Sequence, residues 1–267
     1  MASDSRFAVL IDAENVSVKY IKIIFDELSK DGIATYKRIY GDWTNPSLIS
    51  WKSTLLDNSI TPIQQYSYTS GKNSTDSAMI IDAMDILYSG KVEGFCLVSS
   101  DSDFTRLASR LRESGMAVIG MGESKTPNSF IAACNKFKYL DILSAAEGEE
   151  GEESPKAEAA KKTAQPKKAA QRASSKKAKE ESKTEKEPKP ADEPRTSLRT
   201  IRRALRTIVR ENSDEDNWIM VSQVCNLLDK RYPDFDVRNF GFSKLTPFLE
   251  SLDMFEIKDM KKDSSSP

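Results

Sequence analysis

Carboxylates at three places in the chain have types and spacings that could do chemistry. Asp12 directly follows one continuous apolar run, Asp101 and Asp103 closely follow another, and Asp76 begins a helical stretch. Two carboxylates about 4 Å apart repel each other by about 4 kcal/mol at an effective dielectric constant near 20, so a cluster of four favours a bound cation. Oxygen ligands favour Mg²⁺ or Mn²⁺ over zinc. A cation held in this way suits phosphoester hydrolysis, because it lowers the pKa of a bound water and stabilises charge on the phosphate.

The absence of histidine excludes several other kinds of chemistry. None of the 267 residues is a histidine, which rules out Ser-His-Asp and Cys-His nucleophiles and any zinc site with an imidazole ligand. The three cysteines Cys96, Cys134 and Cys225 are too few for an all-thiolate zinc site and are typical of reduced thiols in a cytoplasmic protein. No apolar run approaches the roughly 20 residues of a membrane span, and the N-terminus lacks the layout of a signal peptide. We therefore expect a cytoplasmic protein with no membrane contact.

Strand-like and helix-like stretches alternate in the first half of the chain and must position these acids. Apolar runs predict strands at 7–11, 34–40, 60–66, 95–98 and 117–121, and helical periodicity predicts helices at 16–29, 46–57, 74–88, 104–114 and 129–136. Such an alternation predicts an α/β fold, with a parallel sheet covered by helices. The active crevice of such a sheet lies at the carboxyl ends of its strands, so we expect Asp12, Asp76, Asp101 and Asp103 to converge there. The alternative for each aspartate is that it only caps the following helix.

Other polar residues belong to the same crevice. Asn15 could bind substrate or a water on the metal, or could cap a helix. Lys72 could contact a phosphate, or could be an ordinary surface lysine. Ser99 and Ser100 could contact phosphate or cap a helix. Asp82, later on the Asp76 helix, is expected to support the ligands from behind.

The composition changes abruptly near residue 147. Residues 147–197 contain no Val, Ile, Leu, Phe, Tyr or Trp, so they cannot bury enough apolar surface to offset the entropy of ordering. We expect a first domain at 6–144, a disordered linker rich in Ala, Lys, Glu and Pro at 145–196, and a second domain at 197–260. The lysine block of the linker is either a solvated tether or a source of non-specific attraction to phosphate.

Three motifs in the first domain resemble the NYN domain, a LabA-like branch of the PIN-like nucleases. The motifs occur in the family's order and spacing: Asp12-Ala13-Glu14-Asn15, then Lys72, Asp76 and Asp82, then Ser99-Ser100-Asp101-Ser102-Asp103-Phe104. The family often has glycine where Ser100 stands. The resemblance implies a Rossmann-like PIN-type fold and a metal-dependent ribonuclease. It further implies that Asp12, Asp76, Asp101 and Asp103 bind the metal, while Asn15, Lys72 and Ser100 lie at the substrate.

A phosphatase of the HAD type is a competing interpretation. That chemistry needs a second aspartate two residues after the nucleophilic one, and Glu14 stands there instead. We therefore favour the nuclease.

The second domain carries a basic helix face and a further resemblance. Five arginines (Arg199, Arg202, Arg203, Arg206 and Arg210) share a helix with apolar residues on its other side, and the order of elements, with strands expected at 218–220 and 254–258, indicates a winged helix-turn-helix. The segment Asn239-Phe240-Gly241-Phe242-Ser243-Lys244-Leu245 resembles the LOTUS (OST-HTH) module. This implies RNA binding or docking of a partner protein, with Arg199, Arg238 and Lys244 as candidate contacts.

Together these features predict a Mg²⁺- or Mn²⁺-dependent ribonuclease whose tethered second domain recruits RNA. The alternative from another class is a non-catalytic adaptor that binds RNA or protein in RNA metabolism. Clustered carboxylates argue against the adaptor, because binding alone does not need them. The RNA target, the number of metal ions, the oligomeric state and endonuclease as against exonuclease action are not specified by the sequence.

Overall fold

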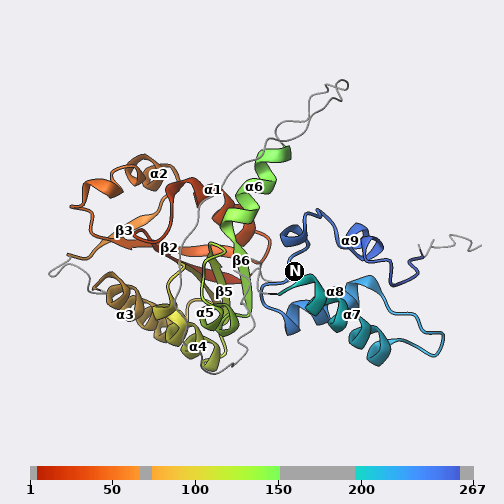
Figure 1. The fold of residues 1–267 in the computed structure, drawn as a ribbon. Helices are drawn as coiled ribbons and strands as arrows, with labels where there is room; N and C mark the ends of the chain where they lie inside the picture. The colour runs from red at the N-terminus through yellow and green to blue at the C-terminus, as the bar shows by residue number, and fades with distance from the viewer. Residues whose placement is uncertain (1–4, 67–73, 151–195, 259–267) are drawn as a thin grey trace, which may run out of the picture.

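A computed structural model describes residues 5–66, 74–150 and 196–258 of the chain, without the side chains of 74, 75 and 147–150. Its centre is a parallel sheet of six strands in the order β3-β2-β1-β4-β5-β6 (Figure 1). The strands are β1 Arg6–Asp12, β2 Ile33–Gly41, β3 Thr61–Gln64, β4 Gly94–Val98, β5 Ala117–Gly122 and β6 Lys136–Tyr139. The predicted α/β fold with a parallel sheet is therefore confirmed.

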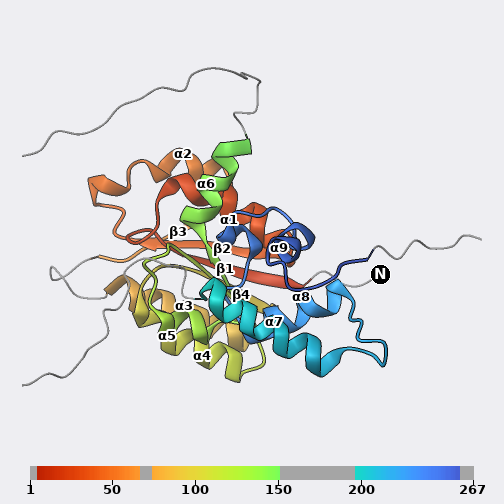
Figure 2. The same cartoon turned by 45° about the vertical axis from the view of Figure 1, so that its right-hand side comes forward.

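Helices cover both faces of this sheet. On one face lie α1 Ile21–Leu28, α2 Trp51–Asp57 and α6 Leu140–Glu150; on the other lie α3 Ser74–Ser89, α4 Thr105–Glu113 and α5 Asn128–Ala133 (Figure 2). Strand β1 has apolar side chains on both of its sides, so it needs a layer of helices on each face of the sheet. Val9 and Ile11 pack into the first layer and Ala8 and Leu10 into the second, all with no exposed surface. A strand buried on both faces reads as a continuous apolar run, which is how it was recognisable in the sequence.

Short 3₁₀ turns precede several helices and shorten them relative to the sequence prediction. Turns η1 Val18–Tyr20, η2 Pro46–Leu48 and η3 Ser102–Phe104 lead into α1, α2 and α4. The last part of the first domain also differs from the prediction. The helix expected at 129–136 ends at Ala133, and strand β6 begins at Lys136. Phe137 and Tyr139 alternate with lysines and are buried, which is the two-residue period of a strand. Helix α6 then crosses the domain boundary expected at residue 144.

The C-terminal domain is helical. It consists of α7 Leu198–Asn212, α8 Val221–Arg231, the 3₁₀ turn η4 Val237–Phe240 and α9 Leu245–Ser251, packed around a separate apolar core. The strands expected at 218–220 and 254–258 are not formed. These segments instead lie beside each other, with the Lys258 ammonium 4.4 Å from the Trp218 ring centroid.

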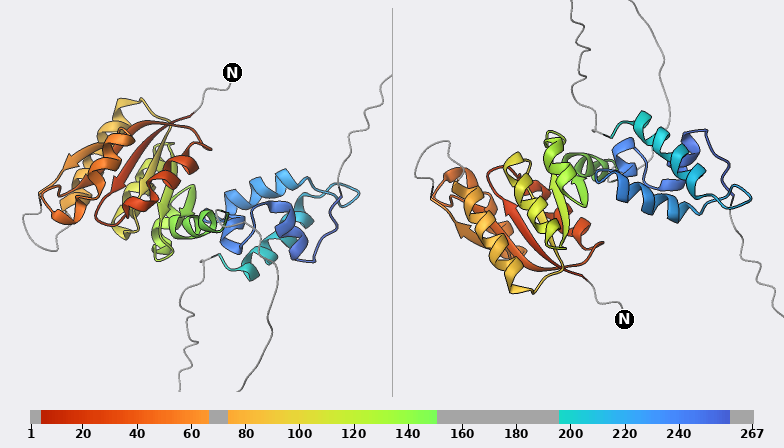
Figure 3. Two further views of the ribbon diagram at one scale, coloured as in Figure 1. Left: turned by 90° about the horizontal axis from the view of Figure 1, so that it is seen from above. Right: turned by 90° about the horizontal axis from the view of Figure 1, so that it is seen from below.

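The two domains touch along the β6 side of the sheet. Figure 3 shows the C-terminal domain beside α5 and α6, with the beginning of α3 on the far side of the first domain. Among the residues described, no helix has both the length and the apolar character needed to cross a bilayer. The thiols of Cys96 and Cys134 are buried, whereas Cys225 is partly exposed.

Candidate metal centre

Asp12 is fixed at the carboxyl end of β1 by hydrogen bonds. Its side chain is 1% exposed. Its Oδ1 accepts from the backbone N–H groups of Glu14 (3.0 Å) and Asn15 (3.3 Å), and its Oδ2 accepts from the Asn15 amide (2.7 Å) and the Ser99 hydroxyl (2.9 Å). These four hydrogen bonds fix the orientation of the Asp12 carboxyl group. The predicted accessory residue Asn15 therefore contacts Asp12 itself.

Ser99 connects the ends of the two central strands. Its hydroxyl is fully buried; it donates to Asp12 and accepts from the N–H of Asp101 at 3.1 Å. Asp101 in turn accepts from the N–H of Asp103 at 2.9 Å and caps the turn η3. The helix-capping alternative thus holds for one oxygen of Asp101, which leaves the second carboxylate oxygen for a ligand. Ser99 was expected either to contact phosphate or to cap a helix. Its hydroxyl is buried and bonds to Asp12 instead of capping a helix.

Three of the four predicted acids form one cluster. Asp76, Asp101 and Asp103 each offer a carboxylate oxygen, and these oxygens all lie within 4.8 Å of one another. The cluster does not include Asp12, although Asp12 lies close enough to act on Asp76 electrostatically. Burial, followed by the negative charges of Asp12, Asp101 and Asp103, raises the pKa of Asp76 from 3.8 to about 6. Glu14, two residues after Asp12, adds to this effect and is not among the acids predicted to bind the metal.

The donor set fits a hard divalent cation. Two oxygens bound to the same Mg²⁺ lie at most about 4.2 Å apart, because each Mg–O distance is about 2.1 Å. The three oxygens of the cluster lie within 4.8 Å of one another, so they would move closer together on binding such an ion. Oxygen-only donors match Mg²⁺ and Mn²⁺. Burial and then the neighbouring carboxylates raise the pKa of Asp76, and a cation would offset the negative charge of those neighbours.

A glycine lets the end of β5 approach this site. A Cβ atom on Gly122 would lie 2.6 Å from the Ser99 carbonyl oxygen and 3.0 Å from the Ser100 hydroxyl. The Ser100 hydroxyl accepts from the N–H of Glu123 at 2.9 Å, which joins the loop after β4 to the end of β5. An isolated glycine at a strand end signals such a close approach, and the Gly120-Met121-Gly122 segment carried that signal.

Comparison with known families decides the assignment. The model of the NYN domain matches residues 6–141. The chain belongs to the NYN family. The model of the OST-HTH/LOTUS domain matches residues 196–266, so both resemblances seen in the sequence are confirmed. NYN domains are PIN-like nucleases that generally depend on divalent metals, and LOTUS domains bind RNA and sometimes proteins. The chain therefore has a nuclease-like domain and an RNA-associated domain.

The other comparisons add little. No curated protein matches the chain. A crystal structure of a Vibrio parahaemolyticus protein of unknown function is 18% identical, covers 53% of this chain and 96% of its own, and has a TM-score of 0.45.

Behind the centre of the NYN domain, Asp82 joins α3 to β2. Its carboxylate accepts from the Tyr40 hydroxyl and forms an ion pair with Arg38. Tyr40 lies opposite Asp12 in the sheet, and its carbonyl oxygen accepts from the N–H of Ala13 at 3.0 Å. The role expected for Asp82, support from behind, is consistent with these contacts. Its partners could not be read from the sequence, because Arg38 and Tyr40 are expected to lie within a strand like any others.

The candidate contacts in the LOTUS domain have different surroundings. Arg199 and Lys244 are exposed. Arg199 lines one side of α7 together with Arg202, Arg203 and Arg206, so the predicted basic face exists. Arg238 instead faces the NYN domain and forms ion pairs with Glu27 and Asp236. Lys72 lies outside the described residues.

Proposed function

We propose that the chain is a divalent-metal-dependent ribonuclease in which Asp76, Asp101 and Asp103 hold Mg²⁺ or Mn²⁺. The observation that carries this proposal is the set of three carboxylate oxygens within 4.8 Å of one another, at the strand ends where an α/β sheet binds its ligands. A cation there would place positive charge beside a phosphodiester and lower the pKa of a water molecule next to it.

The residues around the cluster keep a compact negative site in place. Asn15 and Ser99 hold Asp12 through its Oδ2 oxygen, so its charge stays next to Asp76 without a rearrangement. Ser99 also positions the backbone of Asp101. Such pre-positioned groups lower the cost of ordering the site during the reaction. The absence of histidine is compatible with this arrangement, because every group in it is a carboxylate, an amide or a hydroxyl.

The exposed arginine face of α7 is the proposed attachment site for RNA. Arg199, Arg202, Arg203 and Arg206 lie together on it, and guanidinium groups bind phosphate through paired N–H donors. Attraction of this kind is independent of base sequence and weakens as salt rises. The NYN domain then supplies the cleaving centre and the LOTUS domain the affinity.

Cleavage of an end-labelled RNA tests the centre. Wild type is expected to cut in Mg²⁺ or Mn²⁺ and to stop in EDTA. The substitution Asp101→Asn removes a charge from the cluster and is expected to abolish cutting. Asp85→Asn is the matched control, because Asp85 is exposed on the same helix as Asp76, and it should cut like wild type. Equal cutting by wild type and Asp101→Asn, or cutting that persists in EDTA, would contradict the proposed centre.

A further inference from the structure

The outer edge of β6 is covered by the C-terminal domain. β6 is the last strand of the sheet, and an open edge strand presents unpaired N–H and C=O groups to other chains. Here the N–H of Phe137 donates to the carbonyl oxygen of Pro233 at 2.7 Å. The sheet is thus continued by one hydrogen bond into a segment almost one hundred residues away along the chain.

A buried polar contact lies next to this hydrogen bond. Tyr139, at the end of β6, is 2% exposed, and Asp234 in the C-terminal domain is 4% exposed. The Tyr139 hydroxyl donates to Asp234 Oδ2 at 3.2 Å, and the N–H of Thr196 donates to the same oxygen at 3.3 Å. Buried carboxylates are costly unless they are hydrogen-bonded. Tyr139 therefore satisfies a group that separation of the domains would strip of a partner.

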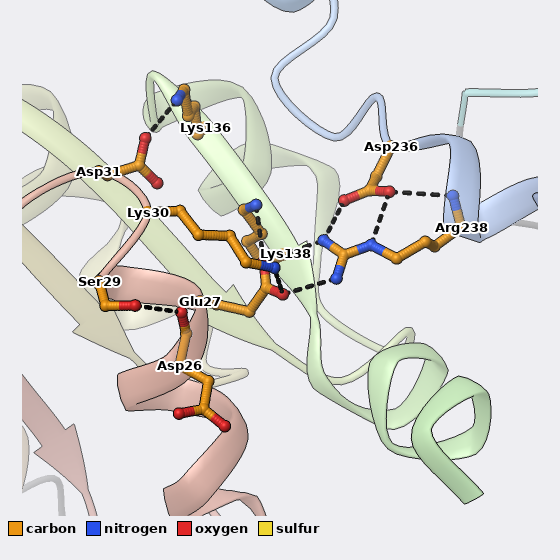
Figure 4. A network of polar contacts seen from close by, with 9 residues as sticks. All are labelled: Asp26, Glu27, Ser29, Lys30, Asp31, Lys136, Lys138, Asp236 and Arg238. Atoms are coloured by element: carbon orange, nitrogen blue, oxygen red, sulfur yellow. Dashed lines mark hydrogen bonds and ion pairs between the residues drawn. The ribbon is translucent and has the colours of Figure 1, made fainter. Parts of the chain in front are cut away.

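An ion cluster completes the contact, as Figure 4 shows. Glu27 at the end of α1 is 4% exposed. Arg238 donates to both of its oxygens, at 2.6 and 2.9 Å, while Lys138 of β6 contacts it at 2.8 Å and Lys30 also pairs with it. Burial raises the pKa of Glu27, but the hydrogen bonds from Arg238, Lys138 and Lys30 outweigh this effect and hold the pKa well below its ordinary value.

These contacts engage nearly all the N–H donors of the Arg238 side chain. Four of its N–H donors are engaged, two with Glu27 and two with Asp236 of its own domain. A guanidinium has five such donors. A guanidinium binds a phosphate through the same paired N–H donors that it uses for a carboxylate. Arg238 thus cannot grip a phosphate while it holds Glu27.

We propose that the outer edge of β6 and the end of α1 form a docking surface for the chain's own C-terminal domain, and that Arg238 holds the domain there through Glu27. The contacts fit this occupant on three counts. Glu27 forms an ion pair with Arg238. The N–H of Phe137 donates to the carbonyl oxygen of Pro233, and the buried Tyr139 hydroxyl donates to Asp234. The assignment is independent of whether the NYN domain cleaves RNA.

The test uses the full chain and the exchange rate of the Phe137 amide, measured by NMR, together with small-angle scattering. Glu27→Lys alters only the NYN side, and Arg238→Glu only the C-terminal side. Each is expected to raise the Phe137 exchange rate about tenfold or more, since breaking one buried charge pair loosens such a contact at least that much, and to enlarge the radius of gyration. Arg210→Glu, on the exposed side of α7, is the matched control and should change neither quantity.

Retained protection of the Leu10 and Ile208 amides shows that each domain is still folded. If Arg238→Glu unfolds its own domain, Glu27→Lys decides the question from the other side. An unprotected Phe137 amide in wild type, or protection and size that Glu27→Lys leaves unchanged, would overturn the proposal. A protected amide in a particle of twice the chain mass would also overturn it, because the docked domain would then belong to a second copy.

Discussion

Replacing Asp76 by asparagine should stabilise the protein in the absence of metal. Asp76 is 8% exposed, and burial together with the neighbouring carboxylates raises its pKa from 3.8 to about 6. Each pKa unit corresponds to about 1.4 kcal/mol, so the ionised side chain costs the folded state up to about 3 kcal/mol. Asparagine has nearly the same shape and no charge. We expect a gain of about 1 to 3 kcal/mol at pH 7.5, because salt ions screen part of the repulsion.

The pH dependence of this gain follows from the sign of the pKa change. The folded state binds the Asp76 proton more tightly than the unfolded state does, so the cost is absent below about pH 4 and develops as the pH rises to about 6. Above that pH the cost is constant. The stability difference between Asp76→Asn and wild type should therefore be large at pH 7.5 and vanish near pH 4.

Urea unfolding in EDTA, followed by tryptophan fluorescence at both pH values, measures this difference. Asp85→Asn on the same helix is the control and should stay within about 0.5 kcal/mol of wild type. Mg²⁺ at one hundred times its dissociation constant should stabilise wild type by about 2.7 kcal/mol and the variant by less. A variant no more stable than wild type at pH 7.5, or a gain of the same size at pH 4, would contradict the expected effect of the Asp76 charge.

Three further perturbations probe the supports of the centre and the RNA surface. Ser99→Ala removes the buried hydroxyl that donates to Asp12 and should cost about 1 to 3 kcal/mol in urea unfolding, with weaker Mg²⁺ binding in calorimetry; unchanged values would exclude its linking role. Gly122→Ala places a Cβ 2.6 Å from the Ser99 carbonyl oxygen and should lower the melting temperature and RNA cleavage together, a result that normal cleavage would contradict. The pair Arg202→Glu and Arg206→Glu should weaken RNA binding at least about tenfold at low salt and flatten its salt dependence, measured by fluorescence anisotropy; binding equal to wild type would remove α7 from the RNA surface.

The sequence was sufficient for the layers and for the meeting place of the acids. Continuous apolar runs marked the buried strands, and the carboxyl ends of parallel strands meet at one edge of the sheet. Asp76, Asp101 and Asp103 cluster there as expected, with Asp12 adjacent. The first inference depends on apolar runs that can be read directly along the chain. The second adds only the general rule that parallel strands end at the same edge of the sheet.

Other features depend on contacts between distant residues. β6 is only four residues long, too short for its alternation to stand out beside a predicted helix. The partner of Arg238 lies 211 positions away, so the sequence showed only an arginine in an RNA-binding module. Ser99 looked like one of two equivalent serines, and only the pairing of β1 with β4 separates its role from that of Ser100.

The order of the strands also implies a minimum length for an RNA that uses both domains. The acidic centre lies at the ends of β1 and β4, while the C-terminal domain lies beyond β6, with β5 between β4 and β6. Neighbouring strands are about 4.8 Å apart, so β4 and β6 alone are separated by about 10 Å. Stacked nucleotides advance about 3.4 Å each, and three of them are needed to cover that distance before any nucleotide touches the LOTUS domain. If the chain acts on RNA as proposed, shorter oligonucleotides would reach the centre without gaining affinity from the second domain, and the NYN–LOTUS chain would discriminate among RNAs by their length.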